Sequence, residues 1–317
     1  MILSPIEQSI KQKIETVGTP LKDWDIQINY GIKTGFNDAF IVSTEKRDEI
    51  LANCSNEDER KRTDALIRPI LRGRDIKRYG YEWAGLYLIA TFPARHYDID
   101  KYPAVKQYLL SFAYEYLIEN GNKWVAENHL ADFCKQKLDQ TGQYVVINGK
   151  YITDDKGNKE KGRKKTSNKW FETQDSISYW EVFCRPIIPW QRITAANQFC
   201  ITSPGTLVLD SMAFISNTKG EEYLLLAVLN SRLVYFWIKK NVHEYGSTGF
   251  RLSNQYVEQI PIPMVNEHLH MQAKLLVESL LNNEDQETED RINMFVYNLY
   301  GLTSKEIDVI ESVQTQL

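Results

Sequence analysis

The most apolar stretch of the chain, residues 223–238, limits the possible folds more than any other segment. It is interrupted by the polar residues 230–232, and it is shorter than the roughly 20 residues that a bilayer-spanning helix needs. We therefore predict a largely buried helix over residues 221–240 and no membrane segment. A buried helix requires a sizeable core around it, and a chain of 317 residues is long enough to form one.

The segments around this stretch alternate between helical and strand-like spacing. Ser4-Pro5-Ile6-Glu7 combines an N-cap serine, a proline and a capping-box glutamate, so a helix begins there. Asn148-Gly149 lies between two apolar segments and is the strongest short indication of a hairpin. Further helices are expected over residues 48–66 and 123–138. We predict an α+β fold with a mixed sheet and flanking helices, divided into an N-terminal helix and connector (1–24), an α+β body (25–265) and a helical C-terminal region (266–317).

Composition restricts the partners and the compartment. The formal net charge is −4, from 38 Lys and Arg against 42 Asp and Glu. A nucleic-acid partner must therefore be held by a local basic surface and not by the charge of the whole molecule. The cysteines show no paired spacing, which argues against a disulfide framework or a zinc site and fits a cytoplasmic protein. They are Cys54, Cys134, Cys184 and Cys200.

Several enzyme motifs are missing from the sequence. An amino-methyltransferase needs a polar-Pro-Pro-aromatic loop and a glycine-rich turn, and the chain has neither a Pro-Pro pair nor a Gly-x-Gly turn. No Asp…Glu-x-Lys arrangement for metal-dependent cleavage is convincing, because Glu221 and Glu222 open an apolar helix. The histidines are scattered, and no Gly-x-Ser-x-Gly elbow is present. We expect no catalytic residue and no metal site in this chain.

Three stretches combine positive charge with groups that hydrogen-bond phosphates or base edges. The first is residues 68–79, where Arg72 and Arg74 can each form paired bonds to a phosphate or to the edge of a guanine. The alternative is that these arginines pair with Asp75 and nearby carboxylates and brace the fold.

The second stretch is a basic tract beside the predicted hairpin, and its alternative is a solvated loop without function. Its candidate residues are Lys161, Arg163, Lys164 and Lys165. The third comprises two polar turns, whose glycines allow a ligand to approach the backbone, although turns are rich in such residues for backbone reasons as well. The candidates in these turns are Lys33, Thr34, Asn37, Ser247, Thr248 and Arg251.

These segments resemble one known family, the TaqI-like C-terminal specificity (target-recognition) domain of type IIG restriction–modification enzymes. The similar segments follow the family's order and include Lys33-Thr34-Gly35-Phe36-Asn37 and Arg72-Gly73-Arg74-Asp75. The others are residues 169–172, 229–231, 249–253, 259–263 and 296–303. The insert at residues 144–165 departs from the family pattern, and its role stays open.

The resemblance implies a sequence-specific reader of double-stranded DNA, which positions an adenine methyltransferase and a nuclease of the same polypeptide. It also implies that no cofactor binds this chain, because S-adenosylmethionine and magnesium are used by those other domains. An alternative is a module that docks a methyltransferase and has little DNA contact of its own, which the helical C-terminal region and the aromatic residues suit. An enzyme with an unfamiliar site is a third possibility.

Overall fold

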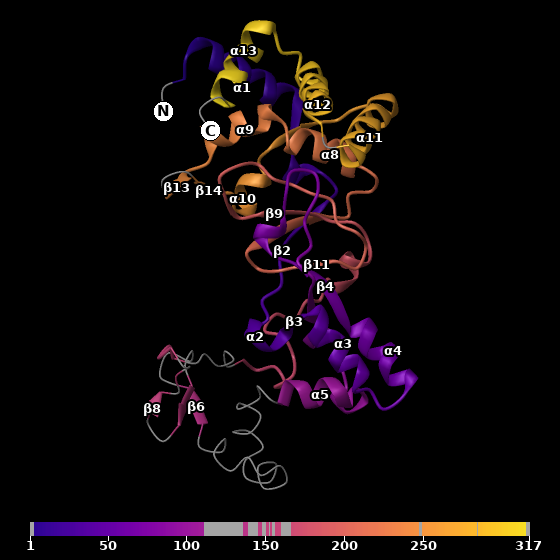
Figure 1. Cartoon of the computed structure of the whole chain (residues 1–317). Helices are drawn as coiled ribbons and strands as arrows, with labels where there is room; N and C mark the ends of the chain where they lie inside the picture. Colours follow the sequence, from indigo (N-terminus) through magenta and orange to yellow (C-terminus); the bar gives the residue numbers. More distant parts are fainter. Residues whose placement is uncertain are drawn as a thin grey trace. The chain divides into compact units, whose positions relative to one another are not determined.

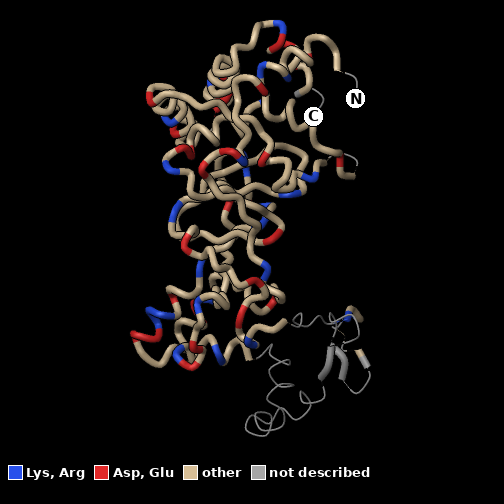
Figure 2. Tube along the Cα trace, turned by 180° about the vertical axis from the view of Figure 1, so that it is seen from behind, with Lys and Arg blue, Asp and Glu red and all other residues tan. Residues whose placement is uncertain are grey.

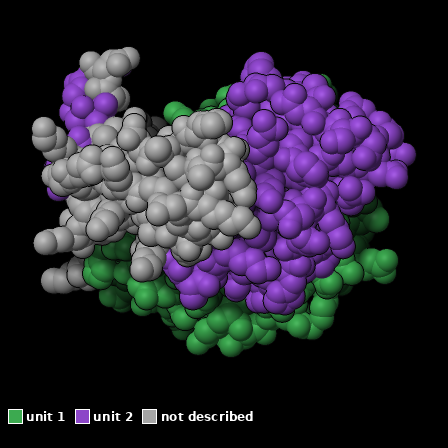
Figure 3. All heavy atoms as spheres, turned by 90° about the horizontal axis from the view of Figure 1, so that it is seen from below, with its two compact units in different colours: residues 1–31, 71–84, 181–317 green, residues 32–70, 85–180 purple. Residues whose placement is uncertain are grey.

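The chain folds into two compact units, each assembled from segments that lie apart in the sequence (Figures 1 and 3). Unit 1 comprises residues 1–31, 71–84 and 181–317, and unit 2 comprises residues 32–70 and 85–180. The computed structural model describes residues 3–110, 136–138, 145–147, 150–151, 153, 156–159, 166–246, 249–283 and 285–314.

The helices of unit 1 share one hydrophobic core. They are α1 (Pro5–Val17), α8 (Glu222–Leu229), α9 (Arg232–Asn241), α10 (Asn254–Val257), α11 (Glu267–Asn282), α12 (Gln286–Leu299) and α13 (Ser304–Gln314). α1 begins as predicted, with a capping box formed by Ser4 and Glu7. α8 packs against α11 and α12, and α13 packs against α9 and α1 (Figure 1). The N-terminal helix and the C-terminal helices therefore cover the apolar stretch at residues 223–238.

That stretch forms two helices, so the prediction of one helix over residues 221–240 is wrong, although the predicted burial is confirmed. Between α8 and α9, the side-chain amide of Asn230 donates to the carbonyl of Phe199 and accepts from its N–H, both at 2.9 Å. The Ser231 hydroxyl accepts a hydrogen bond from the Val234 N–H and caps α9. These two polar side chains satisfy backbone groups at the break, and they thereby separate the helices.

Most strands of unit 1 form small antiparallel sheets. The strands are β1 (Gly18–Pro20), β2 (Gln27–Tyr30), β9 (Ile188–Gln191), β10 (Ile193–Thr194), β11 (Leu207–Val208), β12 (Met212–Ser216), β13 (Glu244–Tyr245), β14 (Gly249–Arg251) and β15 (Pro261–Pro263). β12 lies between β2 and β9, and β14 lies between β10 and β13. Only Arg192 separates β9 from β10, so a single residue joins these two three-stranded sheets.

Unit 2 also mixes helices and strands. Its elements are α2 (Asn37–Phe40), β3 (Ile41–Ser43), α3 (Thr44–Ala52), α4 (Glu57–Leu66), β4 (Ile67–Leu71, whose last residue belongs to unit 1), β5 (Leu86–Ile89), α5 (Pro103–Leu110), β6 (Gln136–Leu138), β7 (Val145–Ile147) and β8 (Lys150–Tyr151). β5 pairs antiparallel with β3 and β4, and α3 packs against β3 and β5.

Three local predictions for unit 2 have different outcomes. The hairpin is confirmed, because β7 and β8 pair antiparallel with Ile147 opposite Lys150. The helix expected over residues 48–66 is two helices, since Asn56 caps α4 by accepting a bond from the Glu59 N–H. The helix expected over residues 123–138 is wrong at its end, where β6 pairs with β7, and residues 123–135 lie outside the described part of the chain.

The α+β fold class and the helical C-terminal region are confirmed. Short 3-10 helices complete the architecture: η1 (Leu21–Asp23), η2 (Gly73–Asp75), η3 (Pro93–Arg95), η4 (Ile99–Lys101) and η6 (Trp180–Cys184). Within the described residues, every helix is too short or too polar to cross a bilayer. The same residues bring together no group of three or more His, Cys, Asp or Glu side chains that could hold a metal ion.

Candidate nucleic-acid interface

The turn after β4 clamps Arg72 and presents Arg74. The Asp75 carboxylate accepts hydrogen bonds from the Arg72 backbone N–H at 2.8 Å, from Nε at 3.1 Å and from Nη2 at 2.8 Å. Asp75 is 4% exposed, so this ion pair is largely removed from water. Arg74 is exposed, and none of the described residues forms an ion pair with it. The alternative that an arginine pairs with Asp75 and braces the fold therefore applies to Arg72 and not to Arg74.

The segment that joins β9 to β10 connects this turn with Arg251. The Gln191 side chain lies against Gly73, where an added Cβ would be 3.0 Å from Gln191 Cγ. Two residues further on, Ile193 is paired with Arg251, the last residue of β14. Neighbouring residues of a strand are about 3.3 Å apart, so residues 191–193 form a short segment of backbone. The turn that carries Arg74 lies at one end of this segment, and Arg251 lies at the other.

Arg192 lies in the middle of that piece and is held over an aromatic ring. Its guanidinium carbon is 4.8 Å from the centre of the Tyr30 ring, and Nη1 donates to the carbonyl of Asp210 at 3.2 Å. Stacking of this kind fixes the plane of an arginine and keeps its charge. Sequence analysis missed Gln191 and Arg192 because they belong to no charge run. Their position directly after the apolar strand residue Trp190 is the feature that could have indicated them.

In unit 2, hydrogen bonds within the turn at residues 33–37 and hydrogen bonds to Asp175 hold the turn in place. Thr34 is 1% exposed, and its hydroxyl donates to Asn37 Oδ1 at 2.6 Å. The Lys33 N–H donates to the Asp175 carboxylate, and the Asp175 N–H donates back to the Lys33 carbonyl. Thr34 therefore stabilises the turn, whereas the side chains of Lys33 and Asn37 are exposed.

The described candidates form two groups, one in each unit. Unit 2 holds Lys33, Thr34 and Asn37, and unit 1 holds Arg72, Arg74 and Arg251. The remaining candidates lie outside the described residues; they are Lys161, Arg163, Lys164, Lys165, Ser247 and Thr248. A DNA contact by any of the twelve stays a prediction.

Many other basic residues of unit 1 are engaged within the protein. Figure 2 shows both signs of charge interspersed along the backbone of both units. Ion pairs join elements of unit 1 to one another: Lys13 with Glu306, Arg78 with Glu289, Arg232 with Asp290 and Glu311, and Lys240 with Glu7. Arg74 and Arg251 differ from these residues in being exposed without such a partner among the described residues.

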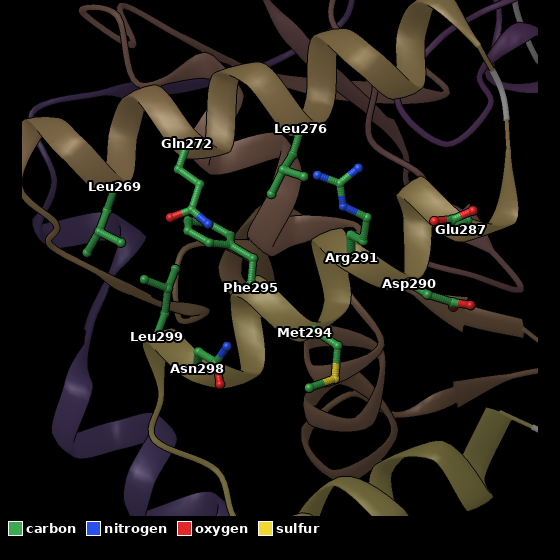
Figure 4. A pocket seen from close by; sticks show the side chains of 10 residues that line it. All are labelled: Leu269, Gln272, Leu276, Glu287, Asp290, Arg291, Met294, Phe295, Asn298 and Leu299. Atoms are coloured by element: carbon green, nitrogen blue, oxygen red, sulfur yellow. The ribbon is translucent and has the colours of Figure 1, made fainter.

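A groove between α11 and α12 is a second surface feature of unit 1 (Figure 4). It has a volume of about 820 Å³, and apolar side chains from the two helices point into it. Those side chains include Leu269, Leu276, Phe295 and Leu299, while Met294 at its rim is 47% exposed.

Comparisons with known proteins agree with the sequence motifs. A family described as the TaqI-like C-terminal specificity domain matches residues 68–262, which is more than half of the chain. No curated protein sequence matches the chain. The fold is similar to that of the type IIL restriction-modification enzyme MmeI in complex with DNA, at 12% identity and a TM-score of 0.52, over 92% of this chain and 35% of that one. The type IIG restriction endonuclease BpuSI matches at 11% identity and a TM-score of 0.47, over 94% and 33%.

The chain thus spans about a third of the length of either solved structure. At such low identity, the likeness to MmeI shows a shared fold and no more. The matched region contains the clamped arginine turn, the β9–β10 segment and Arg251, so all described candidates of unit 1 lie inside it. The chain belongs to the family of TaqI-like C-terminal specificity domains.

Proposed function

We propose that the chain is the sequence-specific, double-stranded DNA recognition domain of a type IIG restriction–modification enzyme. In this proposal it positions an adenine methyltransferase and a nuclease that belong to the same polypeptide. A specificity domain is not itself catalytic. We therefore assign methylation and cleavage, together with S-adenosylmethionine and magnesium, to those other domains. Family membership and the fold shared with MmeI, an enzyme whose structure contains DNA, support this assignment.

The observation that carries the proposal is the contrast between two arginines of one turn. Arg72 neutralises Asp75, whereas Arg74 is exposed and lacks an ionic partner in the described part of the chain. The clamp limits the freedom of the turn before binding, so less conformational entropy is lost when Arg74 contacts a ligand. An arginine fork matches the O6 and N7 atoms of guanine in the major groove, and it also matches a phosphate.

The lysine candidates suit a different task. An ammonium group is a point charge that attracts phosphates without distinguishing base edges. Lys33, exposed on the turn of unit 2, and the lysines of the basic tract are therefore assigned to the DNA backbone, where they set the register of the domain on the duplex.

Selection of binding sites from random duplex DNA tests the proposed function. The chain should enrich a defined sequence, and the experiment should be repeated with a methyltransferase domain attached. Arg74→Ala should weaken binding to the selected site by about 1–3 kcal/mol and relax the preference at one position. Lys305→Ala, an exposed lysine of α13, is the control and should leave the preference unchanged. Equal enrichment of all sequences by the unmodified chain contradicts the proposal.

A second candidate function is docking of a methyltransferase domain, which the groove between α11 and α12 favours. Exposed apolar side chains lie at its rim and on α11, including Met294 and Leu275, the latter 61% exposed. A complex with a methyltransferase that forms without DNA and is insensitive to salt supports docking as the main activity. Met294→Lys, at an exposed residue that lines the groove, should weaken that complex, and binding to DNA should be unaffected.

A further inference from the structure

Gln191 ends β9 beside the turn that carries Arg74. A Cβ on Gly73 would lie 3.0 Å from Gln191 Cγ, 3.1 Å from Cδ and 3.2 Å from Nε2. Gly73 is buried, so the absence of a side chain there allows the glutamine to lie against the backbone. The Gln191 amide is therefore held next to the residue that precedes Arg74.

The residues on either side of Gln191 are anchored by their side chains, whereas the Gln191 side-chain amide has no hydrogen-bond partner among the described residues. Trp190 is fully buried, and its indole N–H donates to the carbonyl of Leu252 at 2.8 Å. Arg192 is held by Tyr30 and Asp210, as described above. The Gln191 side chain is partly exposed, and no described residue is hydrogen-bonded to it. Both its donor and its acceptor are available to a ligand.

We propose that Gln191 reads an adenine next to the base read by Arg74, and that Arg72 is a positioning residue. This inference rests on the proposed function. A glutamine amide matches the N6 and N7 atoms of adenine in the major groove, as an arginine fork matches O6 and N7 of guanine. Neighbouring base pairs are stacked roughly 3.4 Å apart, so two side chains on adjoining backbone segments can reach two adjacent pairs.

Arg72 acts through Arg74. Its fork is occupied by both carboxylate oxygens of Asp75, and leaving that carboxylate buried without its partner would be unfavourable. The pair instead joins Arg72, the residue before η2, to Asp75, the last residue of η2, and Arg74 is the middle residue of that short helix. The direction in which Arg74 extends is thereby set before DNA binds.

Gln191→Glu is the sharpest test, because glutamate has nearly the same shape and keeps the contact with Gly73. A carboxylate only accepts hydrogen bonds, so it disfavours adenine and matches the N4 donor of cytosine. We expect the preference for adenine at one position to fall by roughly 5- to 150-fold, with a gain for cytosine. Base preferences should be measured with the full chain on random duplex DNA. Gln12→Glu, the same change at an exposed glutamine of α1, is the matched control and should change nothing.

Substitutions at two further positions test positioning. Gly73→Ala introduces a Cβ that must displace the Gln191 side chain, so it should reduce the same preference as Gln191→Glu although alanine makes no base contact. Arg72→Ala should reduce the preference at the position that Arg74→Ala affects, and Arg72→Lys should restore part of it. Thermal unfolding of the same samples separates this effect from general destabilisation, which would weaken binding to all sequences alike.

The outcomes distinguish this inference from the proposed function. If the unmodified chain selects a sequence and Gln191→Glu leaves every position unchanged, the role of Gln191 is wrong and the proposed function stands. If the unmodified chain selects no sequence, both are wrong. A loss confined to one position in Gln191→Glu and Gly73→Ala, and to an adjacent position in Arg74→Ala and Arg72→Ala, supports the inference.

Discussion

At the scale of single residues, Asp75 determines the geometry of the arginine turn. It is buried and accepts three hydrogen bonds from Arg72, one from the backbone and two from the guanidinium. Hydrogen bonds to charged groups contribute more to stability than hydrogen bonds between neutral groups. If one partner is lost, the other is left buried without a hydrogen bond, which is unfavourable. The identity of residue 75 therefore affects both the stability of unit 1 and the presentation of Arg74.

We predict that Asp75→Asn lowers the free energy of unfolding by about 2 kcal/mol, because the amide replaces one carboxylate acceptor and removes the charge that Arg72 neutralises. Urea denaturation at neutral pH measures the change. Arg74→Ala, one residue earlier, removes an exposed side chain and should alter stability by no more than about 0.5 kcal/mol. Equal losses in the two variants would contradict the assignment of separate roles.

At the scale of elements, buried amides hold the break between α8 and α9, and Asn230 lies within it. The Asn230 side chain bonds to both backbone groups of Phe199 and also donates to the carbonyl of Leu226 at 3.1 Å. No water can replace these partners easily, because Asn230 is fully buried. The two core helices are therefore connected to the segment at residue 199 by hydrogen bonds of a buried polar side chain.

We predict that Asn230→Ala lowers the free energy of unfolding by about 3 kcal/mol, since the N–H and the carbonyl of Phe199 would both be left unsatisfied. Denaturant titration followed by tryptophan fluorescence measures this loss. The matched control is Asn298→Ala on α12, where the asparagine is exposed and a change within about 0.5 kcal/mol is expected. A small effect at both positions would show that the amide is not needed at the break.

A second element-scale contact joins α1 to α13 through Glu306. Its carboxylate accepts hydrogen bonds from Lys13 and Ser9 of α1 and from the backbone and hydroxyl of Thr303. Burial alone would raise the pKa of Glu306, but these bonds outweigh burial and lower its pKa from 4.5 to about 2. The N-terminal helix is thereby attached to the C-terminal helical region by a charged group.

The depressed pKa of Glu306 predicts how stability depends on pH. The stabilisation is complete above the unfolded-state pKa of about 4.5 and is lost as pH falls toward the folded-state pKa of about 2. Glu306→Gln should therefore cost about 3 kcal/mol at pH 7 and progressively less as pH falls below 4.5. Denaturant titrations of both proteins between pH 7 and pH 3 measure the difference. Glu15→Gln, in an exposed pair with Lys11, should cost less than about 1 kcal/mol.

At the scale of the whole molecule, the proposed DNA binding has to overcome a net charge of −4. Ion pairs inside unit 1 engage several of its cations, so a limited set of free arginines and lysines must supply the attraction to phosphates. Each phosphate neutralised by the protein releases counterions, which makes affinity fall steeply with salt. Affinity for non-cognate DNA should therefore depend strongly on ionic strength.

We predict that alanine at positions 161, 163, 164 and 165 together lowers the slope of log affinity against log salt by roughly 0.9 for each phosphate contact that is lost. All duplex sequences should weaken alike, since these contacts do not read bases. Titrations at several salt concentrations measure the slope. A control with the same change in charge replaces exposed lysines of other surfaces, namely Lys11, Lys22, Lys274 and Lys305. An unchanged slope in the first variant would exclude the tract as a phosphate contact.

Several features could be predicted because their causes are close together in the sequence. The capping box of α1, the hairpin between β7 and β8 and the burial of the apolar stretch at residues 223–238 each depend on neighbouring residues. The break at Asn230 was not predicted, because the partner of this side chain, Phe199, belongs to another segment. The candidate site could likewise be predicted only in part, since charge runs indicated Arg72 and Arg74 but gave no indication of Gln191.

The sequence by itself determined the fold class, the local helix and hairpin signals and the family, which all follow from residue types in a fixed order. Only the tertiary structure decided which arginine of the turn is clamped, that Thr34 is buried within its own turn, and that Gln191 lies against Gly73. The physical reason is that the availability of a side chain depends on its partners in space. Those partners come from segments distant in the chain, and spacing along the sequence does not specify them.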